Sequence, residues 1–409
     1  MDAERFIILR DANAGLRGFG PGSGGFAGGI RAETGFGLEV PPDPQFDVQM
    51  MDEAEAMEML REPDIIDVAR AMPMRLIEPE AASAPGALAQ SGGPTWGVAA
   101  VGADASPFDG TDVTVAVLDT GADAGHPAFA GMNLVQQDFT GTGNQDANGH
   151  GSHCAGTIFG RDVGGTRIGV APGVSRALIG KVLDDRGSGT SDMLFQAMQW
   201  ASGNGAQVIS MSLGFDFPGF AERLQQQGFP ALLATSIALE GYRMNLRMFD
   251  KLMELMRAQA AFGTGTLVVA AAGNESRRQQ HPNFEVSVSV PAVAEGVVSV
   301  GALAEGGQGM TVAPFSNTNP TVAAPGVGVI SARTGGGLVA LNGTSMACPH
   351  VAGVAALWWQ AVRAANIPAT VRAVEARLLT STRTDVFASG VRLAQRGLGL
   401  VRAPSAAIS

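Results

Sequence analysis

Three polar residues stand where side-chain packing alone would not require a polar group. Asp119 follows the apolar run 113–118, His150 opens the stretch His-Gly-Ser-His-Cys-Ala-Gly-Thr, and Ser345 lies within Leu-Asn-Gly-Thr-Ser-Met-Ala-Cys-Pro-His-Val-Ala-Gly. A serine hydroxyl is a weak nucleophile until a base removes its proton, and an imidazole base works best when a carboxylate fixes its tautomer. Together these residue types could supply a nucleophile, a base and an orienting acid.

Rigid elements must hold such groups in place. Small residues before Ser345 lead into the apolar segment 354–359, which indicates a tight turn and then a buried helix with its positive end at the hydroxyl. Apolar runs typical of strands buried on both faces occur at 113–118, 177–182, 208–213, 267–272 and 297–300. Because helical stretches separate several of them, we predict an α/β fold: a doubly wound, mostly parallel sheet with helices on both faces. Asp119 would then stand at the carboxyl end of a strand, where active residues of such sheets gather.

The chain order Asp, His, Ser is that of subtilisin. The stretches Val117–Gly121, His150–His153 and Gly343–Gly353 resemble the motifs of subtilisin-like serine peptidases, the subtilase family (peptidase S8), and the likeness runs from about Trp96 to the C-terminus. It implies a serine endopeptidase that forms an acyl-enzyme, with Asp119 orienting, His150 as general base and Ser345 attacking the scissile carbonyl. His153 is expected to be a structural hydrogen-bonding group.

The resemblance also implies where substrate binds. Ala270–Asn274 resembles the family's oxyanion stretch, which makes the Asn274 side chain and the Ser345 amide the expected oxyanion donors. Two short segments resemble the edges that clamp an extended peptide as an added β-strand. The first pocket is expected to be apolar and roomy, since its wall is built of small residues. The expected substrate-binding residues are Gly187, Ser188, Gly189, Ser212, Leu213, Gly214, Ala271 and Gly273.

Composition narrows the class of protein. The 409 residues are 45% apolar and carry a formal net charge of −11, which argues against nucleic acid as a partner. Residues 1–85 hold sixteen Asp and Glu against seven Arg, a net of −9, so most of the charge is local. No apolar run is long enough for a membrane span, and the first ten residues do not resemble a signal peptide. We expect a cytoplasmic protein, or a secreted one if a leader has been trimmed.

Two units are expected. Residues 1–85 are predicted to form an α+β module, and a linker follows to about residue 94. The module would contain strands at 6–9, 46–50 and 65–69, a helix at 53–60 and an extended segment at 72–77. The glycine-rich stretch 15–29 is expected to be a loop. The module resembles, more weakly, a subtilase propeptide (inhibitor I9-like). That implies an intramolecular inhibitor whose tail lies in the cleft, and a zymogen that cleaves itself within 78–90.

Residues 95–409 form the expected peptidase domain, with a helical insert at about 215–246. Helices are predicted at 231–239 and 243–256, and the Met-rich stripe of the second favours a place in the core over a docking site. An insert of this size could also gate a cleft. A further helix is predicted at 371–379.

No cofactor is expected to take part in the chemistry. Structural calcium is possible in the family, but the segment after Asp119 and the loop 160–165 offer few of the six to eight oxygens that calcium prefers. The cysteines, Cys154 and Cys348, are expected to be buried thiols with a packing role. The alternative is that they make the activity sensitive to oxidation or to mercurial reagents. Two other functions stay open: a catalytically silent peptide-binding protein on the same fold, and a zinc site of His150, His153 and Cys154, which spacing disfavours.

Overall fold

The structure is a computed structural model that describes residues 3–14, 42–80, 92–261, 263 and 265–406. The glycine-rich stretch 15–29 and most of the expected linker and cleavage region therefore lie outside the described residues. No helix within the described ranges is both long and apolar enough to cross a membrane.

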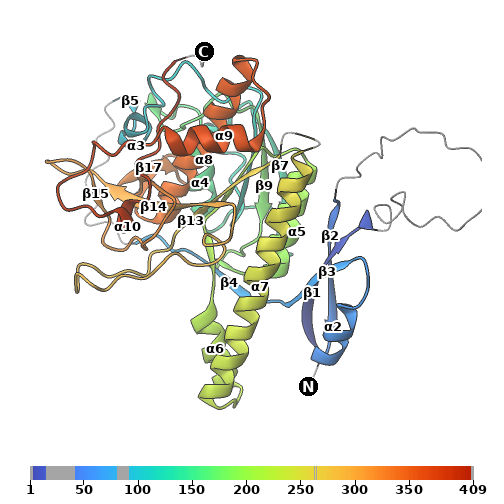
Figure 1. Ribbon diagram of the computed structural model, residues 1–409. Helices are drawn as coiled ribbons and strands as arrows, with labels where there is room; N and C mark the ends of the chain where they lie inside the picture. The colour runs from blue at the N-terminus through green and yellow to red at the C-terminus, as the bar shows by residue number, and fades with distance from the viewer. Residues whose placement is uncertain (1–2, 15–41, 81–91, 262, 264, 407–409) are drawn as a thin grey trace, which may run out of the picture.

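A mostly parallel sheet forms the centre of residues 95–409, the expected peptidase domain (Figure 1). Across the described residues it has eight strands, in the order β15-β14-β13-β11-β6-β9-β7 with β16 beside β14. Its pairs are parallel apart from β14 with β15. The strands are β6 (Thr114–Asp119), β7 (Asn133–Asp138), β9 (Arg176–Lys181), β11 (Val208–Met211), β13 (Leu267–Ala271), β14 (Val297–Ala304), β15 (Thr311–Val312) and β16 (Val322–Pro325).

Helices cover both faces of this sheet, which confirms the predicted fold class. In β6, Val115 and Val117 pack toward the cluster that holds α4 (His150–Phe159) and α8 (Thr344–Ala364). The alternate residues of the same strand, Ala116 and Leu118, pack toward α5 (Ser191–Gly203) and α7 (Ala231–Gln259). Because strand side chains alternate between faces, one apolar run serves two cores.

Shorter elements complete the domain around this sheet. They are α3 (Trp96–Ala100), the 3-10 helix η1 (Pro127–Phe129), α9 (Val371–Thr380), α10 (Leu393–Arg396), and the strands β5 (Gly93–Pro94), β8 (Thr166–Arg167), β17 (Val329–Ala332) and β18 (Leu338–Leu341).

The N-terminal module is a small antiparallel sheet in the order β2-β1-β3, with one helix on its outer face (Figure 1). It contains β1 (Glu4–Asp11), β2 (Pro44–Met51), α2 (Glu53–Met59) and β3 (Ile65–Arg70). Asp52 begins α2 with a capping box to Glu55, which satisfies amides that the first turn cannot pair. In β1, Phe6 and Ile8 pack in the cluster under α2, whereas the alternate residues face the peptidase domain.

A helical hairpin of α6 (Phe217–Gln226) and α7 leaves the peptidase domain beside the module (Figure 1). The prediction of separate helices at 231–239 and 243–256 is wrong, because α7 runs unbroken through both. Gly241 lies mid-helix against Met72, whose side chain leaves only contact distance for an added Cβ. The Met-rich stripe is core as predicted: Met248, Met253 and their neighbours are buried against the sheet.

Candidate active site

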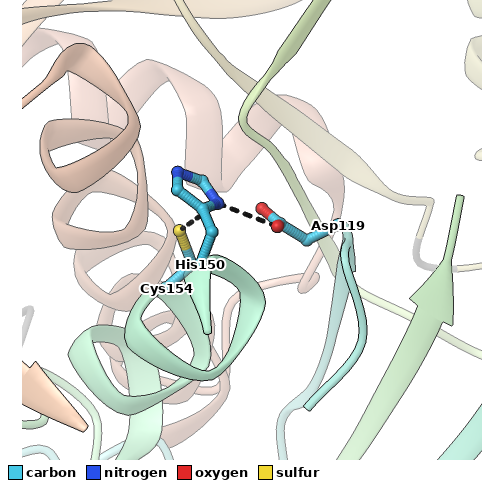
Figure 2. Close-up of side chains that lie close together, drawn as sticks. All are labelled: Asp119, His150 and Cys154. Carbon is cyan, nitrogen blue, oxygen red and sulfur yellow. Dashed lines mark hydrogen bonds and ion pairs between the residues drawn. The ribbon is translucent and has the colours of Figure 1, made fainter. Parts of the chain in front are cut away.

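The carboxylate and the imidazole meet between β6 and α4. Asp119 is the last residue of β6 and His150 the first of α4, and Asp119 Oδ1 lies 2.8 Å from His150 Nδ1 (Figure 2). The Thr120 amide also donates to Asp119 Oδ1, at 2.8 Å. Both side chains are nearly inaccessible to solvent, 1% and 2% exposed, so the pair is not screened by water. His150 Nε2 is buried and has no hydrogen-bond partner among the described residues.

A second buried carboxylate holds the start of α4. Asp146 Oδ1 accepts from the Gly149 amide at 2.8 Å and from Thr120 Oγ1 at 2.9 Å, while its Oδ2 accepts from Ser152. The helix can approach the turn after Asp119 because residue 151 is glycine, where an added Cβ would lie 2.1 Å from the Gly121 carbonyl oxygen. Asp146 was not singled out from the sequence, and its place four residues before His150 is the only signal for it.

The nucleophile candidate lies in the first turn of α8. Ser345 is fully buried, and Oγ donates to the Ile77 carbonyl at 2.9 Å. Pro349 lies four residues on and has no N–H, so it cannot donate the helical hydrogen bond to the Ser345 carbonyl. Ser212 Oγ at 3.3 Å and Cys154 Sγ at 3.4 Å approach that carbonyl instead and replace the missing donor.

Both thiols are buried and free, which confirms that prediction. Burial, with the Asp119 charge adding to it, raises the pKa of Cys154 well above its ordinary value. Burial also raises the pKa of Cys348 to about 11. Each sulfur is therefore a neutral S–H at physiological pH, suited to weak donation rather than to nucleophilic or metal chemistry.

Asn274 follows β13 and faces the same cleft. Its Oδ1 accepts from Thr344, at 2.9 Å from N and 2.8 Å from Oγ1, which fixes the amide with Nδ2 outward. Nδ2 donates to the Glu78 carbonyl at 2.9 Å. Residue 343 is glycine, and a Cβ there would lie only 3.1 Å from Asn274 Nδ2, so the glycine leaves room for the amide.

The end of the module lies in the cleft as the middle strand of a three-stranded sheet. β4 (Pro73–Leu76) pairs antiparallel with β10 (Ser188–Thr190) and with β12 (Leu213–Phe215). We call residues 73–80 the tail.

The structure brings most of the predicted substrate-binding residues to the tail. Ser188 and Gly189 pair with Arg75 and Met74. Leu213 and Gly214 pair with Leu76 and Arg75. The Gly187 carbonyl accepts from Leu76 N at 2.7 Å and the Ser212 carbonyl from Ile77 N at 3.3 Å. Ala271 is buried at the end of β13, and Gly273 donates to Thr344 Oγ1.

Ser345 and Asn274 contact two successive carbonyls of the tail. Ser345 Oγ reaches Ile77 O, whereas Asn274 Nδ2 reaches Glu78 O. Beyond them, Glu80 N donates to the Asn342 carbonyl at 2.8 Å, which anchors the far end of the tail. Acyl transfer needs the nucleophile and the oxyanion donor at one carbonyl, so the tail as bound is not aligned for attack.

Charged groups that were missed from the sequence flank the tail. Arg75 lies 3.5 Å from Glu275 and 3.8 Å from Asp216, and Arg277 lies 3.1 Å from Glu80. A cavity of about 370 Å³ opens beside the tail and is lined in part by Glu275 and Arg277. The nearness of these two residues to Asn274 in the sequence could have indicated their position, whereas nothing in the sequence marks Asp216.

The zinc interpretation does not fit the donor chemistry. His153 Nε2 lies 3.0 Å from the Val329 carbonyl, and burial lowers the pKa of His153 to about 3. Asp119, His150 and Cys154 do have ligand atoms within 4.8 Å of one another. Their acid and imidazole are bonded to each other, however, and the thiol is protonated, whereas zinc needs three or four convergent, deprotonated ligands.

Comparison with known proteins assigns the chain to a family. Residues 110–399 match the model of the subtilase family of peptidases, a span that contains Asp119, His150, Asn274 and Ser345. The chain belongs to the subtilase family. It is a subtilisin-like serine endopeptidase, as the resemblance implied.

Individual relatives agree with this assignment. Over 270 residues the chain is 35% identical to Subtilisin DY of Bacillus licheniformis, covering 64% of this chain and 83% of that protein. It is 36% identical over 253 residues to the Thermostable alkaline protease of Halalkalibacterium halodurans, covering 61% and 57% of the two chains. Subtilisin-like protease 6 of Trichophyton rubrum is 33% identical over 285 residues, covering 64% and 57%. The matched region thus spans little more than half of the last two relatives.

Proposed function

We propose that Asp119, His150 and Ser345 act as the catalytic triad of this endopeptidase. His150 Nε2 takes the proton from Ser345 Oγ as the oxygen attacks the scissile carbonyl carbon, and Asp119 stabilises the imidazolium. Asn274 Nδ2 and the Ser345 amide bind the oxyanion, and His150 returns the proton to the leaving amine. Water then hydrolyses the acyl-enzyme by the same steps. The observation that carries this proposal is the buried contact of 2.8 Å between Asp119 and His150.

We further infer that the chain is a self-processed zymogen and that its N-terminal module is an intramolecular inhibitor. Support comes from the tail, which fills the cleft between β10 and β12 and accepts the hydrogen bonds of Ser345 and Asn274. Because these two donors hold different carbonyls, Ile77 and Glu78 must move relative to Ser345 and Asn274 before the bond between them can be attacked. Self-cleavage is expected within 78–90, a region described only as far as Glu80.

The test compares wild type with Ser345→Ala by intact mass and by labelling with a serine-directed phosphonate. The wild-type chain should shorten with time and take up the label, while Ser345→Ala should stay full length and unlabelled. In subtilisin the loss of the nucleophile lowers kcat by about 10⁶, and a similar loss is expected here.

Ser381→Ala, at the C-cap of α9, is the matched control and should behave as wild type. Unchanged shortening of Ser345→Ala would rule out self-processing by this serine. A wild-type chain that binds peptides but neither shortens nor takes up label would favour the catalytically silent peptide-binding protein.

A further inference from the structure

The tail provides a bound peptide from which the preferences of the cleft can be inferred. Met74, Leu76 and Ile77 are buried against the peptidase domain, whereas the Arg75 side chain is 51% exposed. Ile77 lies against Gly214, where an added Cβ would meet both Ile77 Cγ1 and Ser289 Oγ. Because Ser345 Oγ contacts the Ile77 carbonyl, we take Ile77 as the residue at the first pocket. Arg75 then lies two places before it, and its guanidinium faces charged groups.

Two carboxylates face the Arg75 guanidinium from separate elements. Asp216 precedes α6 and its Oδ1 lies 3.8 Å from Arg75 Nη1, while Glu275 Oε1 lies 3.5 Å from Nη2. The Asp216 side chain is 16% exposed and that of Glu275 38% exposed, so neither charge is fully screened by water.

Each carboxylate is held in place by bonds that do not involve the tail. Asp216 caps α6 and accepts from the Gly219 amide at 3.1 Å. Glu275 Oε2 accepts from Asn317 Nδ2 at 2.7 Å, and Asn317 is itself fully buried. Asn317 Oδ1 also accepts from the Glu275 amide at 3.1 Å. The two charges would therefore remain at the cleft when another peptide replaces the tail, and little side-chain entropy would be lost on binding.

We propose that Asp216 and Glu275 determine specificity and select peptides with a basic residue two places before the residue in the first pocket. The substrate class is an extended segment of the pattern apolar-basic-apolar-apolar, as in the Met-Arg-Leu-Ile of the tail. This inference rests on the proposed function, because it takes the tail to lie where substrate lies.

The expected selectivity follows from the charges. One partly exposed ion pair contributes little, but a cation here gains from two carboxylates, and an acidic residue at the same place is repelled by both. Arg277, the cation nearest the site in sequence, is paired with Glu80 at the other end of the tail. Exchange of a basic for an acidic residue should therefore change kcat/KM by about tenfold at low salt, and by less in 1 M salt.

The first test measures turnover by the self-processed enzyme. Anilide substrates of the form Met-Xaa-Leu-Ile, with Arg, Gln or Glu at the second place, are compared by kcat/KM. Wild type should prefer Arg over Glu by about tenfold, and the double variant Asp216→Asn with Glu275→Gln by about twofold or less. Both amides retain an oxygen for the bonds from Gly219 and Asn317, so the charge is removed while the local structure is kept.

Glu295→Gln is the matched control. Glu295 is an exposed carboxylate paired with Arg257, and its loss should leave the Arg preference unchanged. A wild-type preference near one, or a preference that survives in the double variant, would overturn the assignment of Asp216 and Glu275. If no peptide is cleaved and no phosphonate is taken up, the proposed function fails instead.

A second test needs no turnover and uses the full-length Ser345→Ala chain. Arg75→Gln should speed amide hydrogen exchange at Leu76 and Ile77 about threefold to fivefold, whereas Arg61→Gln, on the exposed side of the module, should not. In the background of the double variant, Arg75→Gln should have no further effect, because the partners are already gone. Additive effects would show that the two carboxylates do not hold Arg75.

Discussion

The module meets the peptidase domain through two contacts of different chemistry. In the cleft, the tail is held mainly by its main chain, through β10 and β12 on either side and through Ser345 and Asn274. Beside the hairpin, the module sheet rests on α5 and α7 through apolar side chains. There the Phe46 ring stacks on Phe195 at a centroid distance of 5.2 Å, and Phe195 packs against Phe249 at 5.6 Å.

The two contacts have different roles: the cleft recognises an extended peptide, and the docking contact provides affinity for the module. Main-chain bonds in the cleft would hold any extended peptide, so they cannot distinguish the tail from substrate. The docking contact uses groups that a substrate peptide lacks, among them the carbonyl of Arg70, which accepts from the buried Asn245 of α7 at 2.7 Å. By fixing the module, this contact keeps the tail at a high effective concentration beside the cleft. We therefore expect docking to determine how long the cleft stays closed.

The largest effect expected from this comparison concerns Asn274, which contacts the tail and which we propose as the oxyanion donor. Asn274→Ala should lower kcat by about 10²- to 10³-fold, the loss seen when subtilisin loses its oxyanion asparagine. Its bond to Glu78 is only one of several that hold the tail, so hydrogen exchange at residues 76–78 should rise only about threefold to tenfold.

Steady-state kinetics and exchange measure the two effects separately. Asn204→Ala, at the end of α5, is a control expected to change neither. Equal losses in kcat and in tail protection would indicate that Asn274 acts mainly on the tail and would contradict its role as oxyanion donor.

Loss of an aromatic ring from the docking contact should release the tail more than loss of the Asn274 side chain does. Phe46 is 9% exposed and belongs to the cluster shared with α5 and α7, so Phe46→Ala should weaken docking by about 3 kcal/mol, or about a hundredfold in module opening. Hydrogen exchange of the tail in the Ser345→Ala chain measures this opening equilibrium.

Ile8→Ala is the matched control for Phe46→Ala. Ile8 is fully buried but packs in the cluster under α2, on the other face of the module sheet. Ile8→Ala should destabilise the module but increase hydrogen exchange of the tail less than Phe46→Ala does. If both substitutions release the tail equally, docking is not a separate source of affinity.

Much of the candidate active site could be predicted from the sequence because short motifs encode its local geometry. Asp119 ends a strand and Ser345 lies in the first turn of a helix, as their apolar neighbours indicated. The predictions that were wrong or missing concern contacts between segments that are distant in the sequence. The sequence predicts separate helices at 231–239 and 243–256, yet α7 runs unbroken through both, with Gly241 packed against Met72. Nor could the sequence indicate that Ser345 and Asn274 contact neighbouring carbonyls, since the register of the tail depends on strands more than a hundred residues away.

A smaller effect is expected from Asp67, a carboxylate at the docking contact whose burial destabilises the docked module at neutral pH. Asp67, in β3, is desolvated near Arg247 and Lys251 of α7, and burial raises its pKa above the ordinary 3.8 despite those charges and the bond from Val68. A raised pKa means that the folded, docked state binds more protons than the unfolded one. Its contribution to stability is therefore full below pH 3.8 and is lost as the pH rises through the folded pKa.

Asp67→Asn should consequently stabilise the docked module at pH 7 and flatten the pH dependence of its unfolding. Asp64→Asn gives a control of opposite sign, because the hydrogen bond from Arg10 lowers the pKa of Asp64. The stability that Asp64 contributes is present above its ordinary pKa and lost as the pH falls, so its removal should destabilise the module at pH 7. Urea unfolding of the Ser345→Ala chain between pH 4 and pH 8 measures both. If Asp67→Asn destabilised the module at pH 7, the attraction of Asp67 to Arg247 and Lys251 would outweigh its burial, and the docking contact would depend on charge as well as on apolar packing.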